Sequence, residues 1–152
     1  MRLELYTVTM KPNIYLDIDG VLLANDHHAA LHIDDFVATC IERGKNLYWL
    51  TTWCRGDAAP AIRRLKQTDM SPATIELLAT HCLPTDWHTA KTEAIDFAKP
   101  FLWFDDDLFP DEREVLRGHG LLDNWIEVAL HNDQNHLQKF VTSFPLAIQE
   151  VD

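Results

Sequence analysis

Two aspartates, one residue apart, follow an apolar run near the amino terminus. Asp17 and Asp19 come after Ile14-Tyr15-Leu16, and Gly20 is next. Such a run predicts a short buried strand, and alternate side chains of an extended chain point to the same side. Both carboxylates would therefore lean into one crevice, with Gly20 allowing a sharp turn. Because neighbouring carboxylates repel unless a cation or a shared proton relieves them, the pattern predicts a site for Mg²⁺, which takes oxygen ligands.

A second set of acids stands at the end of another apolar run. Phe101-Leu102-Trp103-Phe104 leads into three consecutive aspartates, of which Asp105 and Asp106 are the predicted further metal ligands. Acids directly after a buried strand are costly unless they face a cation or reach solvent. Ligands bind at the carboxyl ends of the strands in a parallel sheet, so we expect both sets of acids to meet there.

The order of polar residues along the chain resembles that of the haloacid dehalogenase (HAD) superfamily of phosphohydrolases. The matching motifs are, in order, Asp17-Ile18-Asp19-Gly20, a threonine after the apolar run 47–50, Lys91, and Asp105-Asp106. The resemblance spans roughly residues 14 to 107. Two runs are also similar to compact HAD-type domains associated with RNA repair: Leu50-Thr51-Thr52-Trp53 and Trp103-Phe104-Asp105-Asp106.

The resemblance implies a role for each of these residues. Asp17 would attack phosphorus and form an aspartyl-phosphate, while Asp19 would protonate the leaving oxygen and then deprotonate the attacking water. Thr51 and Lys91 would stabilise the phosphoryl charge, with Thr52 as the alternative to Thr51. The implied Mg²⁺ ligands are the Asp17 carboxylate, the Asp19 backbone carbonyl, Asp105 and, as a neighbour or additional ligand, Asp106.

The predicted substrate contacts are Gly20, Thr52, Trp53 and Arg55. Arg55 lies on the loop expected at the mouth of the crevice, where it could hold a distal phosphate. Trp53, on the same loop, could stack on a base or another flat group, or pack in the core. The remaining basic residues up to Lys66 are expected to form a solvated helix face.

Strand and helix patterns alternate along the chain, which predicts a single domain over residues 1–152. The expected fold is a three-layer, Rossmann-like α/β fold with a parallel sheet of about five strands and helices on both faces. Expected strands cover residues 14–16, 47–50, 101–104 and 125–130, with another near Leu77 or Cys82. Expected helices cover 33–41, follow Asp57, begin at Ser71, include 94–98, begin at Pro110 and extend from 132 to 144. Residues 1–11 would form either an extra edge strand or a loose leader.

The spacing of the motifs leaves no room for a large cap domain. Only 34 positions separate Asp17 from Thr51, and 54 separate Thr51 from Asp105. The site should therefore be open. By the resemblance, capless members commonly act on extended phosphate esters or beside a partner.

Composition narrows the classes of partner. The net charge of −11 argues against a broad nucleic-acid-binding face, although a bound metal lets an acidic protein take an anionic substrate. Three scattered cysteines favour a reducing cytoplasm, and no apolar run approaches the ~20 residues of a membrane span. The predicted partner is a phosphorylated small molecule or nucleic-acid end, and the oligomeric state stays open. We expect His27, His28 and His32 in a solvated loop rather than a zinc site, since no regular element orients adjacent histidines together.

Three other functions fit parts of the pattern. A phospho-acceptor receiver domain also gathers acids, a threonine and a lysine around magnesium, but its phosphorylated acid lies on the middle strand, where this chain has Thr51. A nuclease could use Asp17, Asp19 and Asp105 as a two-metal site. A non-catalytic binding domain on the same fold is the third alternative.

Overall fold

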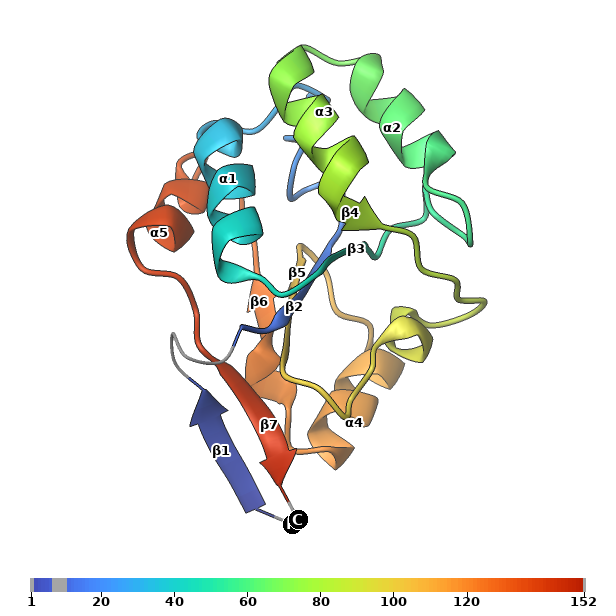
Figure 1. The fold of residues 1–152 in the computed structure, drawn as a ribbon, viewed down its shortest axis with the longest axis vertical. Helices are drawn as coiled ribbons and strands as arrows, with labels where there is room; N and C mark the ends of the chain where they lie inside the picture. Colours follow the sequence, from blue (N-terminus) through green and yellow to red (C-terminus); the bar gives the residue numbers. More distant parts are fainter. Residues whose placement is uncertain (1, 7–10, 152) are drawn as a thin grey trace.

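The computed structural model describes residues 2–6 and 11–151, with side chains for residues 11–149. At the centre is a parallel sheet of five strands in the order β4-β3-β2-β5-β6 (Figure 1). The strands are β2 (Asn13–Leu16), β3 (Leu47–Trp49), β4 (Cys82–Leu83), β5 (Phe101–Asp105) and β6 (Trp125–Glu127). This sheet confirms the predicted α/β, Rossmann-like class, and the described residues include no large cap domain.

The strand β2 lies in the middle of the sheet because it pairs with both β3 and β5. Its last residue, Leu16, is in register with Trp49 of β3 and Phe104 of β5. The carboxyl ends of these three strands therefore lie side by side, and the residues that follow them meet at one edge. Numbered along the chain, the five strands have the spatial order 3-2-1-4-5, which differs from the 2-1-3-4-5 order of flavodoxin-like domains.

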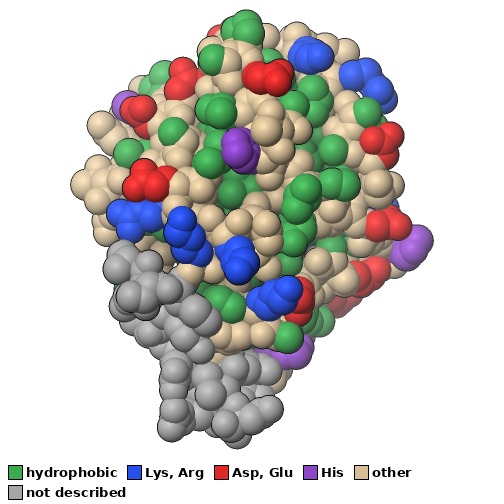
Figure 2. All heavy atoms as spheres, viewed as in Figure 1, with side chains coloured by type: hydrophobic (Ala, Val, Ile, Leu, Met, Phe, Trp, Pro, Cys, Tyr) green, Lys and Arg blue, Asp and Glu red, His purple; other side chains and the backbone are tan. Residues whose placement is uncertain are grey.

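Helices cover both faces of the sheet, as predicted. One face carries α1 (Ile33–Arg43), α2 (Ala59–Lys66), α3 (Pro72–His81) and α5 (His136–Thr142), and the other carries the 3₁₀ turn η1 (Lys91–Ala94), α4 (Pro110–Gly118) and the 3₁₀ turn η2 (Leu122–Asn124). Strand alternation separates two cores, since Ile14 and Leu16 face the first and Tyr15 faces the second. On the face shown in Figure 2, several Lys and Arg side chains lie in a row across the lower part, whereas the acidic side chains are scattered.

Several elements differ in length from their predicted ranges. The third strand is β4, at Cys82, whereas Leu77 lies within α3. The helix expected over 94–98 is only the single turn η1, because Ile95 is already extended and the Asp96 backbone N–H turns to donate to the Tyr15 hydroxyl at 3.1 Å. The strand expected over 125–130 ends at Glu127, and the last helix begins at His136 rather than near 132.

The two chain ends form a separate sheet. β1 (Arg2–Tyr6) pairs antiparallel with β7 (Ala147–Val151) and does not extend the central sheet (Figure 1). The predicted segment 1–11 is thus a strand over residues 2–6, and residues 1 and 7–10 lie outside the described residues. Asn124, fully buried, ties β7 to the body by exchanging hydrogen bonds of 2.6 and 2.8 Å with the Ile148 backbone. Within the described part of the chain, none of the helices combines the length and apolar character needed to cross a membrane.

Candidate active site

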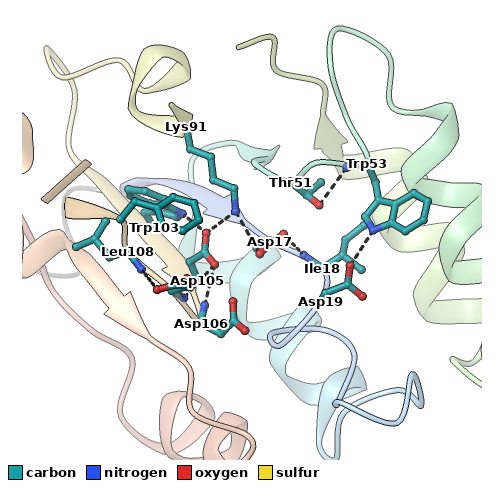
Figure 3. Close-up of polar contacts among 12 residues, drawn as sticks. Asp17, Ile18, Asp19, Thr51, Trp53, Lys91, Trp103, Asp105, Asp106 and Leu108 are labelled. Carbon is teal, nitrogen blue, oxygen red and sulfur yellow. Dashed lines mark hydrogen bonds and ion pairs between the residues drawn. The ribbon is translucent and has the colours of Figure 1, made fainter. Parts of the chain in front are cut away.

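The first two acids of the site end neighbouring strands. Asp17 directly follows β2 and Asp105 ends β5, so parallel pairing brings their buried carboxylates together. Lys91, from η1, places Nζ between them, 3.2 Å from Asp17 Oδ2 and 2.6 Å from Asp105 Oδ2 (Figure 3). Burial alone would lower the pKa of Lys91, but the two carboxylates outweigh that effect and raise this pKa. The predicted lysine therefore lies within ion-pair distance of both strand-end aspartates.

The carboxylate of Asp105 accepts hydrogen bonds from four N–H groups. Its Oδ2 accepts from Lys91 Nζ and, at 3.1 Å, from Trp103 Nε1. Its Oδ1 accepts from the backbone N–H groups of Asp106, at 2.8 Å, and Asp107, at 3.4 Å. Trp103 was not among the predicted site residues. Its position two residues earlier on the same strand, and hence on the same face, is the sequence signal that could have identified it.

The carboxylates of three aspartates converge next to Lys91, and we call them the acidic cluster: Asp17, Asp105 and Asp106. One oxygen of each lies within 4.8 Å of the others, and this is the only such group of His, Cys, Asp or Glu ligands among the described residues. Burial, and then the charge of Asp17, raises the pKa of Asp105 well above its ordinary value, and burial raises the pKa of Asp106. The acidic cluster has three carboxylates and Lys91 supplies only one positive charge, so the oxygen donors of the cluster fit a divalent cation.

Gly20 is required by the close approach of Asp106. Its φ is +84°, and a Cβ at this position would overlap Asp106 Oδ2. A side chain would therefore displace one carboxylate of the acidic cluster, besides straining the backbone. The structure thus places Gly20 against the cluster.

A pocket of about 210 Å³ adjoins the acidic cluster and Lys91. Thr52 lines this pocket and is exposed. Thr51 is fully buried, and its Oγ1 accepts the Trp53 backbone N–H at 3.3 Å. Of the two alternative threonines, Thr52 is therefore the one on the pocket wall.

The carboxylate of Asp19 lies apart from the acidic cluster. Its Oδ2 accepts from Trp53 Nε1 at 2.8 Å, and its Oδ1 lies 3.6 Å from Arg64 Nη2. The side chain points toward Trp53 and away from Lys91 (Figure 3). Asp19 was predicted as a metal residue through its backbone carbonyl, and its side chain is not one of the clustered ligands.

Arg55 is engaged by the loop that follows β4. Its Cζ lies 3.7 Å from the Trp87 ring centroid, and its Nη1 donates to the backbone carbonyls of Trp87 and His88 at 3.3 and 3.2 Å. Trp87 lines the pocket. The predicted phosphate-binding arginine therefore holds part of the pocket wall through these contacts.

Glu112 also lines the pocket and was not predicted. It is 3% exposed, and its two oxygens accept the backbone N–H groups of Lys91 at 2.9 Å and Phe109 at 3.2 Å. It therefore connects the first turn of α4 to the lysine. Only the tertiary fold brings these residues together, since 21 positions separate Glu112 from Lys91.

The three loop histidines have separate partners. His27 Nδ1 lies 2.8 Å from Arg64 Nη2, and His28 Nδ1 lies 3.2 Å from Asp69 Oδ2. His32 Nε2 lies 2.9 Å from Asn135 Oδ1. They do not converge as a ligand group.

Comparison with protein-family models, with curated proteins and with solved structures gives no match. The chemistry has to be argued from the site itself.

Proposed function

We propose that this protein is a Mg²⁺-dependent, HAD-type phosphatase that hydrolyses a phosphomonoester through an aspartyl-phosphate on Asp17. The observation that carries the proposal is the acidic cluster, with oxygens of all three aspartates within 4.8 Å, beside Lys91 and an open pocket. A carboxylate nucleophile, a fixed ammonium and a site for a divalent cation are the groups that phosphoryl transfer needs.

The reaction proceeds in two displacements. Asp17 attacks phosphorus, the bond from phosphorus to the ester oxygen breaks, and that oxygen takes a proton from Asp19. Water then attacks the aspartyl-phosphate, gives its proton to Asp19, and releases inorganic phosphate with Asp17 restored. Lys91 and the Thr52 or Thr51 hydroxyl stabilise the charge on the phosphoryl oxygens. When bound, Mg²⁺ neutralises the same oxygens.

The contacts of Asp105 and Asp106 support different roles for these two residues. Four N–H groups already occupy Asp105, so its proposed role is to anchor Lys91. Asp106 is exposed at the pocket and is proposed, with Asp17, as a carboxylate ligand of Mg²⁺.

The size of the pocket bears on the substrate class. Its roughly 210 Å³ lies below the range of about 300–1,000 Å³ for drug-sized ligands. The rest of an ester would therefore extend over the open mouth. A nucleotide, a phosphorylated polynucleotide end or another extended ester suits this shape, and the proposed compartment is the cytoplasm.

Two alternatives have less support. The middle strand of this sheet is β2, which is followed by Asp17 and not by Thr51, so the sequence-based argument against a receiver domain from the middle strand was wrong. Receiver domains instead differ in their flavodoxin-like strand order, which is not the 3-2-1-4-5 order of this sheet. A two-metal nuclease needs ligands for a second ion, whereas the Asp19 carboxylate is directed to Trp53 and Arg64.

The proposal is tested by a phosphate-release screen. It compares small phosphomonoesters with 5′- and 3′-phosphorylated oligonucleotides, in Mg²⁺ and in EDTA. Asp17→Asn, nearly isosteric, should abolish release and keep the fold. Asp35→Asn, on the exposed surface of α1, should retain full release. Equal release by wild type and Asp17→Asn refutes the nucleophile, and diester cleavage without phosphate release favours the nuclease.

A further inference from the structure

A cluster of side chains surrounds Asp19, two residues after the pocket-lining Asp17. The cluster consists of Asp19 and His27 from the loop after β2, Trp53 from the loop after β3, and Arg64 from α2. Asp19 retains 51% side-chain exposure, whereas Arg64 retains only 12%. Arg64 is therefore not part of the solvated helix face that the sequence predicts, unlike its exposed neighbour Arg63.

Arg64 connects the other three side chains. Its Nη2 lies 2.8 Å from His27 Nδ1 and 3.6 Å from Asp19 Oδ1, and its Cζ lies 5.5 Å from the Trp53 ring centroid. Through its contacts with Asp19 and His27, Arg64 connects two separate parts of the loop after β2. The indole of Trp53 completes the arrangement by donating Nε1–H to Asp19 Oδ2 at 2.8 Å. One oxygen of the Asp19 carboxylate thus faces Trp53 Nε1 and the other faces Arg64 Nη2. The Trp53 and Arg64 side chains also lie against each other.

We propose that Trp53 and Arg64 are positioning residues, which hold the Asp19 carboxylate in one orientation to meet the leaving oxygen of a phosphate ester. The proposal rests on the proposed phosphatase function. In an in-line displacement, the leaving oxygen departs on the side of phosphorus opposite to Asp17. Asp17 and Thr52 line the pocket. The half-exposed Asp19 follows Asp17 by two residues, and its partner Trp53 directly follows Thr52.

This role explains the placement of Trp53 better than stacking or core packing does. Trp53 is 37% exposed, so burial of its ring is incomplete, and its one polar atom is committed to Asp19. Without these two donors, an exposed aspartate would populate several staggered rotamers. Holding one of them raises the fraction of molecules in which the acid is within reach of the ester oxygen.

A positioning role has a signature that a merely structural role lacks. An alkyl phosphate needs a proton on its departing oxygen, whereas p-nitrophenyl phosphate loses a stable anion and needs little help. The ratio kcat/KM reports on the steps up to and including phosphoenzyme formation, in which the leaving oxygen departs. A loss of proton donation should therefore lower kcat/KM for the alkyl ester more than for the aryl ester. General acid catalysis is worth roughly 10²–10⁴-fold. We expect each of the two positioning residues to contribute about tenfold of this factor.

The test compares Trp53→Phe, which keeps the ring and removes the N–H, with Arg64→Gln and the matched Arg63→Gln on the exposed side of the same helix. The measurement is kcat/KM for glycerol 2-phosphate and for p-nitrophenyl phosphate. Trp53→Phe and Arg64→Gln should lose about tenfold on the alkyl ester and less than about threefold on the aryl ester. Arg63→Gln should lose neither. Equal losses on both esters, no loss, or a gain on the alkyl ester overturns the positioning role.

A second readout does not depend on turnover. The indole N–H resonance of Trp53, identified by its absence in Trp53→Phe, should shift in Asp19→Asn more than those of the other tryptophans. An unshifted resonance overturns the proposal even if the variants lose activity. Failure of the wild type to release phosphate from any ester refutes the proposed function and, with it, the catalytic role of Asp19.

Discussion

Replacement of Lys91 by methionine tests the most tightly held part of the site. Methionine keeps an unbranched chain of similar length and removes the ammonium that faces Asp17 and Asp105. At an effective dielectric constant of about 20, the two ion pairs, at 3.2 and 2.6 Å, correspond to attractions of roughly 5 and 6 kcal/mol. The cost of desolvating the three groups offsets much of this sum.

The net loss of stability in EDTA should therefore be about 3–5 kcal/mol, as for other buried charges left without a partner. That is a large fraction of the roughly 5–15 kcal/mol that stabilises a domain. Mg²⁺ should recover part of the loss, because a cation can face Asp17 in place of the ammonium. Phosphate release should fall by at least about 100-fold.

The assay is urea unfolding of the wild type and Lys91→Met in EDTA and in Mg²⁺. Lys99→Met is the control, because Lys99 is 67% exposed and lies 3.8 Å from Asp96. Such a surface pair contributes about 0–1 kcal/mol, so the control should unfold like the wild type. Lys91→Met with an unchanged unfolding midpoint in EDTA refutes the buried ion pairs. A midpoint that Mg²⁺ leaves unchanged in both proteins refutes the cation site.

Three further predictions concern the acidic cluster and the fold. Gly20→Ala should weaken Mg²⁺ binding at least about tenfold, because its Cβ would displace the Asp106 carboxylate, whereas Gly118→Ala, where a Cβ meets nothing within 4 Å, should bind like the wild type. Equal titration curves for the two variants would contradict this. Mg²⁺ affinity should rise with pH through the raised pKa values of Asp105 and Asp106 and level off above them, because protons compete with the ion. Calorimetry giving the same affinity at acidic and at neutral pH would refute it. Asn124→Ala should cost about 2–4 kcal/mol in urea unfolding and speed hydrogen exchange at the Ile148 amide, since two hydrogen bonds are lost; a protected amide would argue against that anchor.

Local sequence patterns determined the central architecture. Each of the apolar runs 14–16, 47–50 and 101–104 is a strand or extends just past one, because a run of this length between polar segments satisfies a strand buried on both faces. Asp17 and Asp105 stand at strand ends for the same reason, since each comes directly after such a run. The strands near Cys82 and at Ala147–Val151 were harder to identify: β4 has two residues, and β7 acquires its pairing from β1, at the other end of the chain.

Only the tertiary structure decided which donor faces which carboxylate. Strand order places β2 between β3 and β5, and this brings Asp17 to Lys91 and Asp19 to Trp53 across 74 and 34 positions of sequence. The arginines show the same dependence, because Arg55 and Arg64 look alike in the sequence yet one stacks on Trp87 and the other connects the loops around Asp19. A local pattern specifies the direction of a side chain from its own strand or helix. The partner it meets depends on how distant segments pack.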